Sequence, residues 1–209
     1  MKSMIMVILF SACTGLLHAQ TNIKLPEPQK TGGMPLMEAL SKRSTSRAFD
    51  TAALSTRQLS NLLWAAFGIN RPDGKRTAPS ARNFQENEIY VLLKSGAYIY
   101  DAKNNMLNLV LAEDIRNLGG TQDFVKDAPV QVILIADLAK AGNGKPEEKL
   151  YTANIDAGYI SQNIYLFCAS EGLATGARGS VDRNALTSKL KLRPEQNIII
   201  AHSVGYPKK

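Results

Sequence analysis

The sequence predicts an α+β fold with a single sheet, on the basis of three observations. Residues 88–93 and 98–100 lie on either side of Ser95-Gly96 and contain alternating Tyr, Val, Leu and Ile side chains, which is typical of a β-hairpin. Residues 128–136 are a near-continuous apolar, β-branched run, as in a buried central strand. Residues 150–170 have the apolar spacing of a long helix. The 209 residues contain no internal repeat and no linker of domain scale, so we expect one folded domain.

Residues 1–19 are predicted to be a secretory signal peptide. Lys2 precedes an apolar run from Met4 to Ala12, and small residues lead to a cleavage position after Ala19. The apolar run is too short for a permanent membrane helix, so no membrane span is expected. The mature chain would begin at Gln20 and be exported to the periplasm.

Two alternatives to simple export stay open. Cys13 follows Ser11-Ala12 and could carry a lipid anchor, although Phe10 occupies the position where leucine is usual. The other alternative is that the first residues are retained and the protein stays in the cytoplasm.

The composition excludes several kinds of chemistry. Two cysteines and two histidines are too few for a disulfide scaffold or a multi-thiolate metal site, and no metal is expected. Removal of residues 1–19 would leave only Cys168 and His202, which we interpret as a core residue and a strand residue without a chemical role. The net charge of +7 favours an anionic partner. Nucleic acid is not expected, because the arginines form no basic stripe.

The N-terminal half is predicted to contain an arm and two helices. Residues 20–35 include prolines and a glycine pair, and are expected to be extended. A short helix is expected over 37–42. A stronger helix begins after Ser55, which forms a capping box with Gln58, and it ends at Gly68. Residues 70–79 should form a loop.

The C-terminal half alternates the remaining strands and helices. Residues 107–117 mix apolar side chains with an acidic pair and are predicted to be helical. The helix over 150–170 is apolar on most faces, so it should be buried on several sides. Residues 173–181 are a strand or loop, Asp182 should cap a short helix ending at Leu190, and residues 196–204 form the last strand.

Two polar segments could bind a ligand. The first segment combines the guanidinium groups of two arginines with two hydroxyl donors, a mixture suited to binding a phosphate. Its residues are Arg43, Ser44, Thr45 and Arg47. The alternative is an exposed helix end.

The second polar segment is residues 76–85. Pro79 and Ser80 can start a helix whose free N–H groups attract anions, and Asn83 and Gln85 suit the edge of a heterocycle. The alternative is an ordinary polar loop.

Together these segments resemble the nitroreductase family of FMN-dependent oxidoreductases. The pattern R-x-[ST]-x-R-x-F at 43–49 is followed by an LLWAAFG helix and by APSAxNxQ at 78–85. The resemblance continues through Asp156-Ala157-Gly158, Gln162-Asn163, 171–175 and 204–207, and it covers residues 36–207. Residues 62–81 look most like the branch that includes azoline (thiazole/oxazole) dehydrogenases.

The resemblance implies a central, mainly antiparallel sheet flanked by helices, with flavin at a homodimer interface. The domain would span residues 36–209. The implied contacts to the phosphate are Arg43, Ser44, Thr45, Arg47 and Lys208, where Ser44 replaces the family's frequent arginine or histidine. The implied contacts to the flavin ring and ribityl chain, usually from the partner subunit, are Pro79, Ser80, Asn83 and Gln85. The implied backbone approach to flavin N5 is at Gly179 and Ser180.

The resemblance implies an FMN-dependent oxidoreductase that transfers hydride through flavin N5 to or from a small organic substrate. The reaction would be nitro or quinone reduction, or azoline-type oxidation, with the cofactor supplying the chemistry. NAD(P)H is the usual electron donor, but export would separate the protein from it. No catalytic side chain is identified. Tyr159, Arg82 and Arg178 are candidate contacts to the substrate. The alternative is that Tyr159 is a buried aromatic residue of the core and that the two arginines are exposed without a role in the site. The alternative function is a non-catalytic flavin-binding or interaction module.

Overall fold

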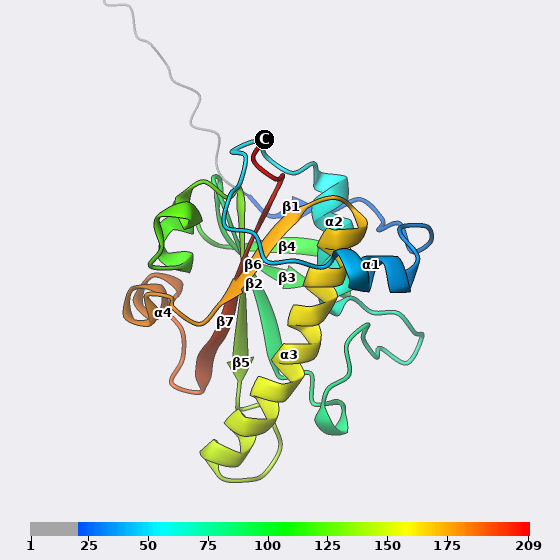
Figure 1. Ribbon diagram of the computed structural model, residues 1–209. Coiled ribbons are helices and arrows are strands. Elements are labelled where there is room, and N and C mark those ends of the chain that lie inside the picture. The colour runs from blue at the N-terminus through cyan, green and yellow to red at the C-terminus, as the bar shows by residue number, and fades with distance from the viewer. Residues whose placement is uncertain (1–20) are drawn as a thin grey trace, which may run out of the picture.

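Seven strands form one sheet in which every neighbouring pair is antiparallel (Figure 1). The computed structural model describes residues 21–209, so the predicted signal peptide and Cys13 lie outside the described residues. The strand order across the sheet is β1-β4-β3-β2-β5-β7-β6. The strands are β1 (Ile23–Lys24), β2 (Asn87–Leu93), β3 (Gly96–Asp101), β4 (Met106–Leu111), β5 (Val130–Asp137), β6 (Ala174–Arg178) and β7 (Gln196–Gly205).

Helices cover both faces of this sheet (Figure 1). One face carries α1 (Leu36–Lys42), α2 (Thr56–Phe67) and α3 (Pro146–Ser170). The other carries α4 (Arg183–Leu190) and the short 3-10 turns η2 (Arg116–Gly119) and η3 (Asp123–Lys126). On β2, Ile89 packs with the α2/α3 cluster while Tyr90 packs with the α4 cluster. The central strands are therefore buried on both sides, as the apolar run at 128–136 predicted.

The predicted helix boundaries of α2 and α4 are confirmed. Ser55 and Gln58 form both hydrogen bonds of the capping box, and Gly68 follows the last turn. The Asp182 side chain accepts from the Ala185 N–H at the start of α4. Cys168 is fully buried in the core, and burial raises the pKa of its thiol well above the usual range.

The prediction of a helix over 107–117 is wrong. Residues 106–111 are strand β4, which pairs with β3 on one side and with Ile23–Lys24 of the N-terminal arm on the other. Asn105 adopts a left-handed conformation (φ 46°) in the turn that joins β3 to β4. Leu107 is fully buried and Val110 exposed, so the apolar positions serve a strand rather than a helix.

Helix α3 differs from the prediction in two respects. It begins at Pro146 rather than at 150, with proline at the first position, where it needs no N–H partner. One face of α3 is exposed in the single chain, with Tyr151 70% and Ile155 43% accessible, rather than buried on several sides. No helix within residues 21–209 has the length and apolar character to cross a membrane.

Candidate active site

The segment Arg43–Phe49 leaves α1 and lies along the outer edge of β6. The Ser46 N–H donates to the Thr175 carbonyl at 2.8 Å, and Phe49 forms a bridge with Pro207. A Cβ at Gly176 would lie 2.6 Å from the Ser46 carbonyl oxygen, so only glycine allows this approach. The Lys208 N–H donates to Ala48 O at 3.4 Å. The structure therefore brings the predicted phosphate contacts of residues 43–47 and Lys208 together.

Three cations, Arg43, Arg47 and Lys208, form a cation cluster that is available to a ligand. Arg43 is half-buried, whereas Arg47 and Lys208 are exposed. Among residues 21–209, Arg43 and Arg47 form no ion pair, in contrast to Arg116, which pairs with Asp114. Ser44 and Thr45 are also exposed, so two hydroxyls lie beside the free guanidinium groups. Such a set can bind an oxyanion through charge-assisted hydrogen bonds.

Tyr165 on α3 connects this segment to the sheet, and sequence reasoning did not single it out. Its hydroxyl lies 3.0 Å from Thr45 Oγ1 and accepts from the Ala177 N–H at 2.9 Å. The Arg43 guanidinium carbon is 5.2 Å from the centre of its ring. No local pattern within the predicted helix over 150–170 indicates this role, because the partners Thr45 and Ala177 lie on other segments.

Gly179 and Ser180 continue the same edge. The Thr175 carbonyl and the Ala177 N–H both point outward from β6, and Gly179 follows directly after Arg178, the last residue of this strand. Gly179 is exposed, and a Cβ there would meet nothing within 4 Å. Within residues 21–209 its N–H has no hydrogen-bond acceptor, whereas Ser180 Oγ accepts from Gln122 Nε2 at 2.5 Å. Gly179 thus offers a free backbone donor beside the cation cluster.

The second polar segment is a strained turn against the middle of α3. The predicted helix after Ser80 is only one 3-10 turn, η1 (Ala81–Asn83), whose first N–H donates to Asp156 Oδ2 at 2.8 Å. Three of its non-glycine residues have positive φ: Arg82 (50°), Asn83 (58°) and Gln85 (50°). Pro79 and Asn83 are exposed.

The side chain of Gln85 forms hydrogen bonds within the protein. Its carbonyl oxygen accepts from Arg76 Nε at 2.7 Å, and its amide donates to Gly74 O and to Asn83 Oδ1. Asn83 therefore keeps its amide nitrogen for a ligand, while Gln85 stiffens the turn.

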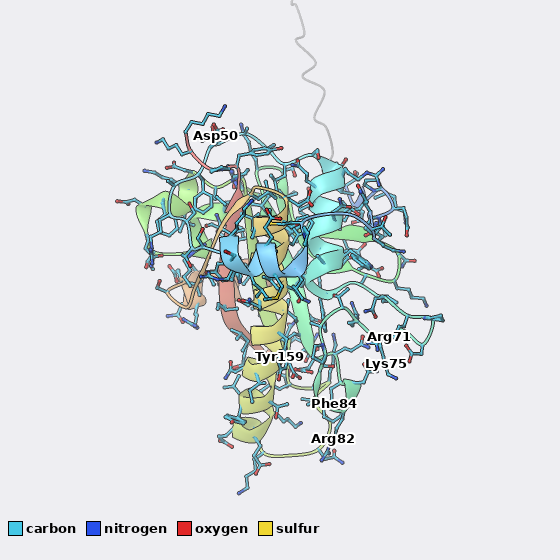
Figure 2. The ribbon with its side chains drawn as sticks, turned by 45° about the vertical axis from the view of Figure 1, so that its right-hand side comes forward. Asp50, Arg71, Lys75, Arg82, Phe84 and Tyr159 are labelled. Atoms are coloured by element: carbon cyan, nitrogen blue, oxygen red, sulfur yellow. The ribbon has the colours of Figure 1, made fainter. Side chains whose placement is uncertain are left out.

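One chain does not bring the two predicted halves of the site together. The first segment contacts α3 at Tyr165 and the second at Asp156, which are separated by about 13 Å of helix axis. In Figure 2, Asp50, just after the first segment, and Arg82 of the second lie at opposite ends of the view. A ligand that uses both segments must therefore take them from two chains or span this length.

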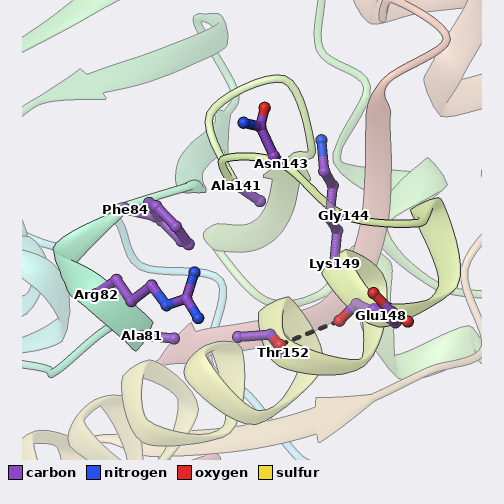
Figure 3. Close-up of a pocket in the computed structure, with 9 residues that line it drawn as sticks. All are labelled: Ala81, Arg82, Phe84, Ala141, Asn143, Gly144, Glu148, Lys149 and Thr152. Carbon is purple, nitrogen blue, oxygen red and sulfur yellow. Dashed lines mark hydrogen bonds between the residues drawn. The ribbon is translucent and has the colours of Figure 1, made fainter.

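A small cavity with both polar and apolar walls adjoins the second segment (Figure 3). It has a volume of about 200 Å³, and Arg82 and Lys149 are the cations on its wall. Phe84 forms another side and is packed against Gly142, where a Cβ would lie 2.7 Å from the ring. Of the candidate substrate contacts, Arg82 faces this cavity, and Tyr159 is 48% exposed on α3 rather than buried.

Arg178 is a structural residue rather than an exposed arginine or a substrate contact. It is 8% exposed, and it donates to Gly119 O at 2.6 Å and to Ser203 Oγ at 2.9 Å. It also donates to Gln131 Oε1. Burial among neutral acceptors lowers the pKa of Arg178 to about 10, so it stays charged at neutral pH.

His202 is a buried strand residue, as predicted. Its ring nitrogens lie 2.8 Å from Ser161 Oγ and 3.3 Å from Thr175 Oγ1. Burial, with a smaller effect of the nearby Arg178 charge, lowers the pKa of His202 to about 3. The ring is therefore neutral and serves as a polar link inside the core.

A buried carboxyl pair lies beneath the second segment, and it was not predicted as a pair. Glu86 and Asp156 are 1% and 4% exposed. Glu86 Oε1 accepts from Asn87 Nδ2 at 3.0 Å, but Oε2 has no partner among the described residues. Burial, and then the Asp156 charge, raise the pKa of Glu86 to about 7. The protonated form of Glu86 avoids placing two buried negative charges next to each other.

Comparison with known proteins gives one consistent family. The model of the nitroreductase family matches residues 40–206. A protein of Methanocaldococcus jannaschii named as a nitroreductase is 27% identical over 181 residues, covering 82% of this chain and 90% of its own. A crystal structure of a protein named as a nitroreductase from Ralstonia eutropha is 38% identical, with a TM-score of 0.86 and 90% of each chain covered. One from Desulfovibrio desulfuricans, solved in complex with FMN, is 20% identical with a TM-score of 0.62, covering 85% of this chain and 89% of its own.

Proposed function

This chain belongs to the nitroreductase family, and from that premise we propose that it is an FMN-dependent oxidoreductase. The observation that carries the proposal is the set of unpaired cations and the free Gly179 N–H along one edge of β6. A flavin mononucleotide has a phosphate at one end and a ring with an N5 acceptor at the other. The two kinds of donor on this edge match those two ends.

The residues divide between two tasks when FMN is bound. Arg43, Arg47 and Lys208 neutralise the phosphate, and the hydroxyls of Ser44 and Thr45 donate to its remaining lone pairs. Gly179 brings a backbone N–H close to the ring without a side chain in between. The cofactor itself supplies hydride transfer at N5, so the protein needs no histidine or thiol in a catalytic role.

A homodimer would complete the site, and the exposed apolar surface supports it. Six of the seven exposed large apolar residues within 21–209 lie on α1 and α3, the exception being Val110. On α3, Tyr151, Ile155 and Tyr159 share one helical face with Gly158, where a Cβ would meet nothing. A second copy seated on this face would cover it and could bring its own residues 79–85 to the flavin.

Gly158→Arg is expected to convert the dimer to a monomer while the fold is kept. The new side chain would occupy open space in the single chain but would place a charge within the proposed interface. The mass in solution, measured by light scattering, should halve, and FMN retention should fall with it. Ser188→Arg, on an exposed position of α4 across the sheet, should change neither. A Gly158→Arg protein that stays dimeric would contradict this interface.

The substrate class proposed is a small organic electron acceptor or donor, as in nitro or quinone reduction or azoline-type oxidation. The resemblance of residues 62–81 to azoline dehydrogenases stays a prediction. So does export, for which intact mass of the mature chain should show a start at Gln20. An exported protein would take electrons from a reductant other than NAD(P)H.

A redox cycle tests the proposed activity. Protein purified with FMN should be yellow, bleach when dithionite reduces it without oxygen, and regain its colour when a nitroaromatic or quinone is added. The reduction of the acceptor should be catalytic, so that each flavin reduces many acceptor molecules while the reductant is in excess. A protein that binds FMN but shows no turnover with any acceptor or donor class would favour a non-catalytic flavin-binding module. A protein with no affinity for FMN would overturn the proposal.

A further inference from the structure

We propose that Tyr165 is a positioning residue that shapes the segment Arg43–Arg47 for an anionic phosphate. The inference rests on the proposed FMN function and assigns a role to a residue outside the motifs that carry the family resemblance. Tyr165 holds three parts of the site at once: the Thr45 hydroxyl, the Arg43 guanidinium and the Ala177 N–H of β6.

Either hydroxyl can donate in the hydrogen bond between Tyr165 and Thr45, and the Ala177 N–H favours donation by the phenol. A phenol has one O–H donor, and one of its lone pairs already accepts from Ala177 N–H at 2.9 Å. When the phenol donates across the 3.0 Å contact, Thr45 Oγ1 accepts, and its own proton is free to point away from Tyr165. Thr45 is exposed, so this proton is offered toward the side where an anion would bind. The reverse direction would leave Thr45 with lone pairs only, which repel a phosphate.

The ring of Tyr165 places Arg43. The guanidinium carbon lies 5.2 Å from the ring centroid, within the range of a cation–π contact. The ring is itself fixed by His202, which packs against it edge-on at 5.2 Å between centroids. His202 is held in turn by Ser161 and Thr175. The buried contacts of His202 with Ser161 and Thr175 therefore fix the Tyr165 ring, and the ring in turn fixes the half-buried Arg43 guanidinium.

These contacts make Tyr165 a positioning residue and not a ligand. Its hydroxyl is engaged with the Ala177 N–H and with Thr45, and its ring lies between Arg43 and His202. We therefore expect its loss to affect the phosphate contacts and to leave contacts to the flavin ring unchanged.

Tyr165→Phe tests the inference, because it keeps the ring and removes the hydroxyl. FMN and riboflavin are titrated against the full-length protein after its bound flavin has been removed, with quenching of flavin fluorescence as the readout. The wild type should bind FMN more tightly than riboflavin, which lacks the phosphate. In Tyr165→Phe the Kd for FMN should rise about 10-fold while the Kd for riboflavin changes less than about 2-fold. Tyr98→Phe, which removes a tyrosine hydroxyl that donates to Ser95 Oγ in the turn between β2 and β3, should leave both constants unchanged.

Thr45→Val supplies a second test, and the effect of this single substitution does not depend on the folding of the tyrosine variant. If Tyr165 acts through Thr45, Thr45→Val should weaken FMN binding alone, and the double variant should be weakened by less than the product of the two fold-changes. An unchanged FMN-to-riboflavin ratio in Tyr165→Phe, or independent effects in the double variant, would overturn the inference. A wild type that binds neither flavin would overturn the proposed function instead.

Discussion

Replacing Arg43 with alanine is expected to weaken FMN binding by about 1.5–3 kcal/mol, which is roughly a 10- to 150-fold rise in Kd. Arg43 is half-buried and stacked on Tyr165, so its guanidinium is held in place before the ligand arrives. Because no carboxylate within residues 21–209 pairs with Arg43, the substitution removes a contact to the ligand without exposing a lone negative charge. Equilibrium titration with FMN measures the effect.

Lys42→Ala is the matched control for charge. Lys42 is the preceding residue and carries the same charge, but it is paired with Glu38 at 2.7 Å on the exposed side of α1. Its removal should change the Kd for FMN less than 3-fold, in line with the small contribution of an exposed pair. Equal effects of the two substitutions would indicate general electrostatic attraction and would contradict a phosphate site at Arg43.

The buried carboxyl of Glu86 is expected to make the protein less stable as the pH rises from about 4.5 to 7. The folded protein keeps the Glu86 proton up to about pH 7, whereas the unfolded chain releases it near pH 4.5. The folded state therefore binds more protons in this range, so the free energy of unfolding falls with rising pH and levels above pH 7. At about 1.4 kcal/mol per pKa unit, the upper bound of the effect is roughly 3.5 kcal/mol.

Glu86→Gln should remove this pH dependence. The amide is neutral at every pH, as the protonated carboxyl is, so we expect a variant more stable than the wild type by about 1–3 kcal/mol at pH 8 and equal near pH 4.5. Urea unfolding at both pH values measures the difference. His202 resists protonation in both proteins, so its own loss of stability below about pH 6.5 cancels in the comparison.

Glu147→Gln gives the corresponding control, because Glu147 is exposed in the first turn of α3. It should change stability by less than about 0.5 kcal/mol at either pH. A Glu86→Gln protein that is less stable than the wild type at pH 8 would show that the ionised Glu86 carboxylate is not destabilising in the fold, and would contradict its raised pKa.

Local signals in the sequence predicted much of the fold. The capping box of Ser55 and Gln58, the cap at Asp182 and the apolar run at 128–136 each depend on residues a few positions apart. Strand β4 was mispredicted because its pattern is set by distant partners. Leu107 is buried by pairing with Ile23 and Tyr100, which no local spacing reveals.

The site shows the same division between local and distant information. The motif at 43–47 and the glycine at 179 were predicted, and the structure places them along one strand edge. The roles of Tyr165 and Glu86 were not predicted, because each depends on a partner far along the chain: Thr45 lies 120 residues before Tyr165, and Asp156 lies 70 residues after Glu86.

A crystal structure of the protein with FMN tests the central claim most directly. We predict the phosphate within hydrogen-bond distance of Arg43, Arg47 and Thr45 of one chain, with the flavin ring beside Gly179. Residues 79–85 of the partner subunit should complete the pocket. A flavin bound elsewhere, or a phosphate that does not contact Arg43, would contradict the account.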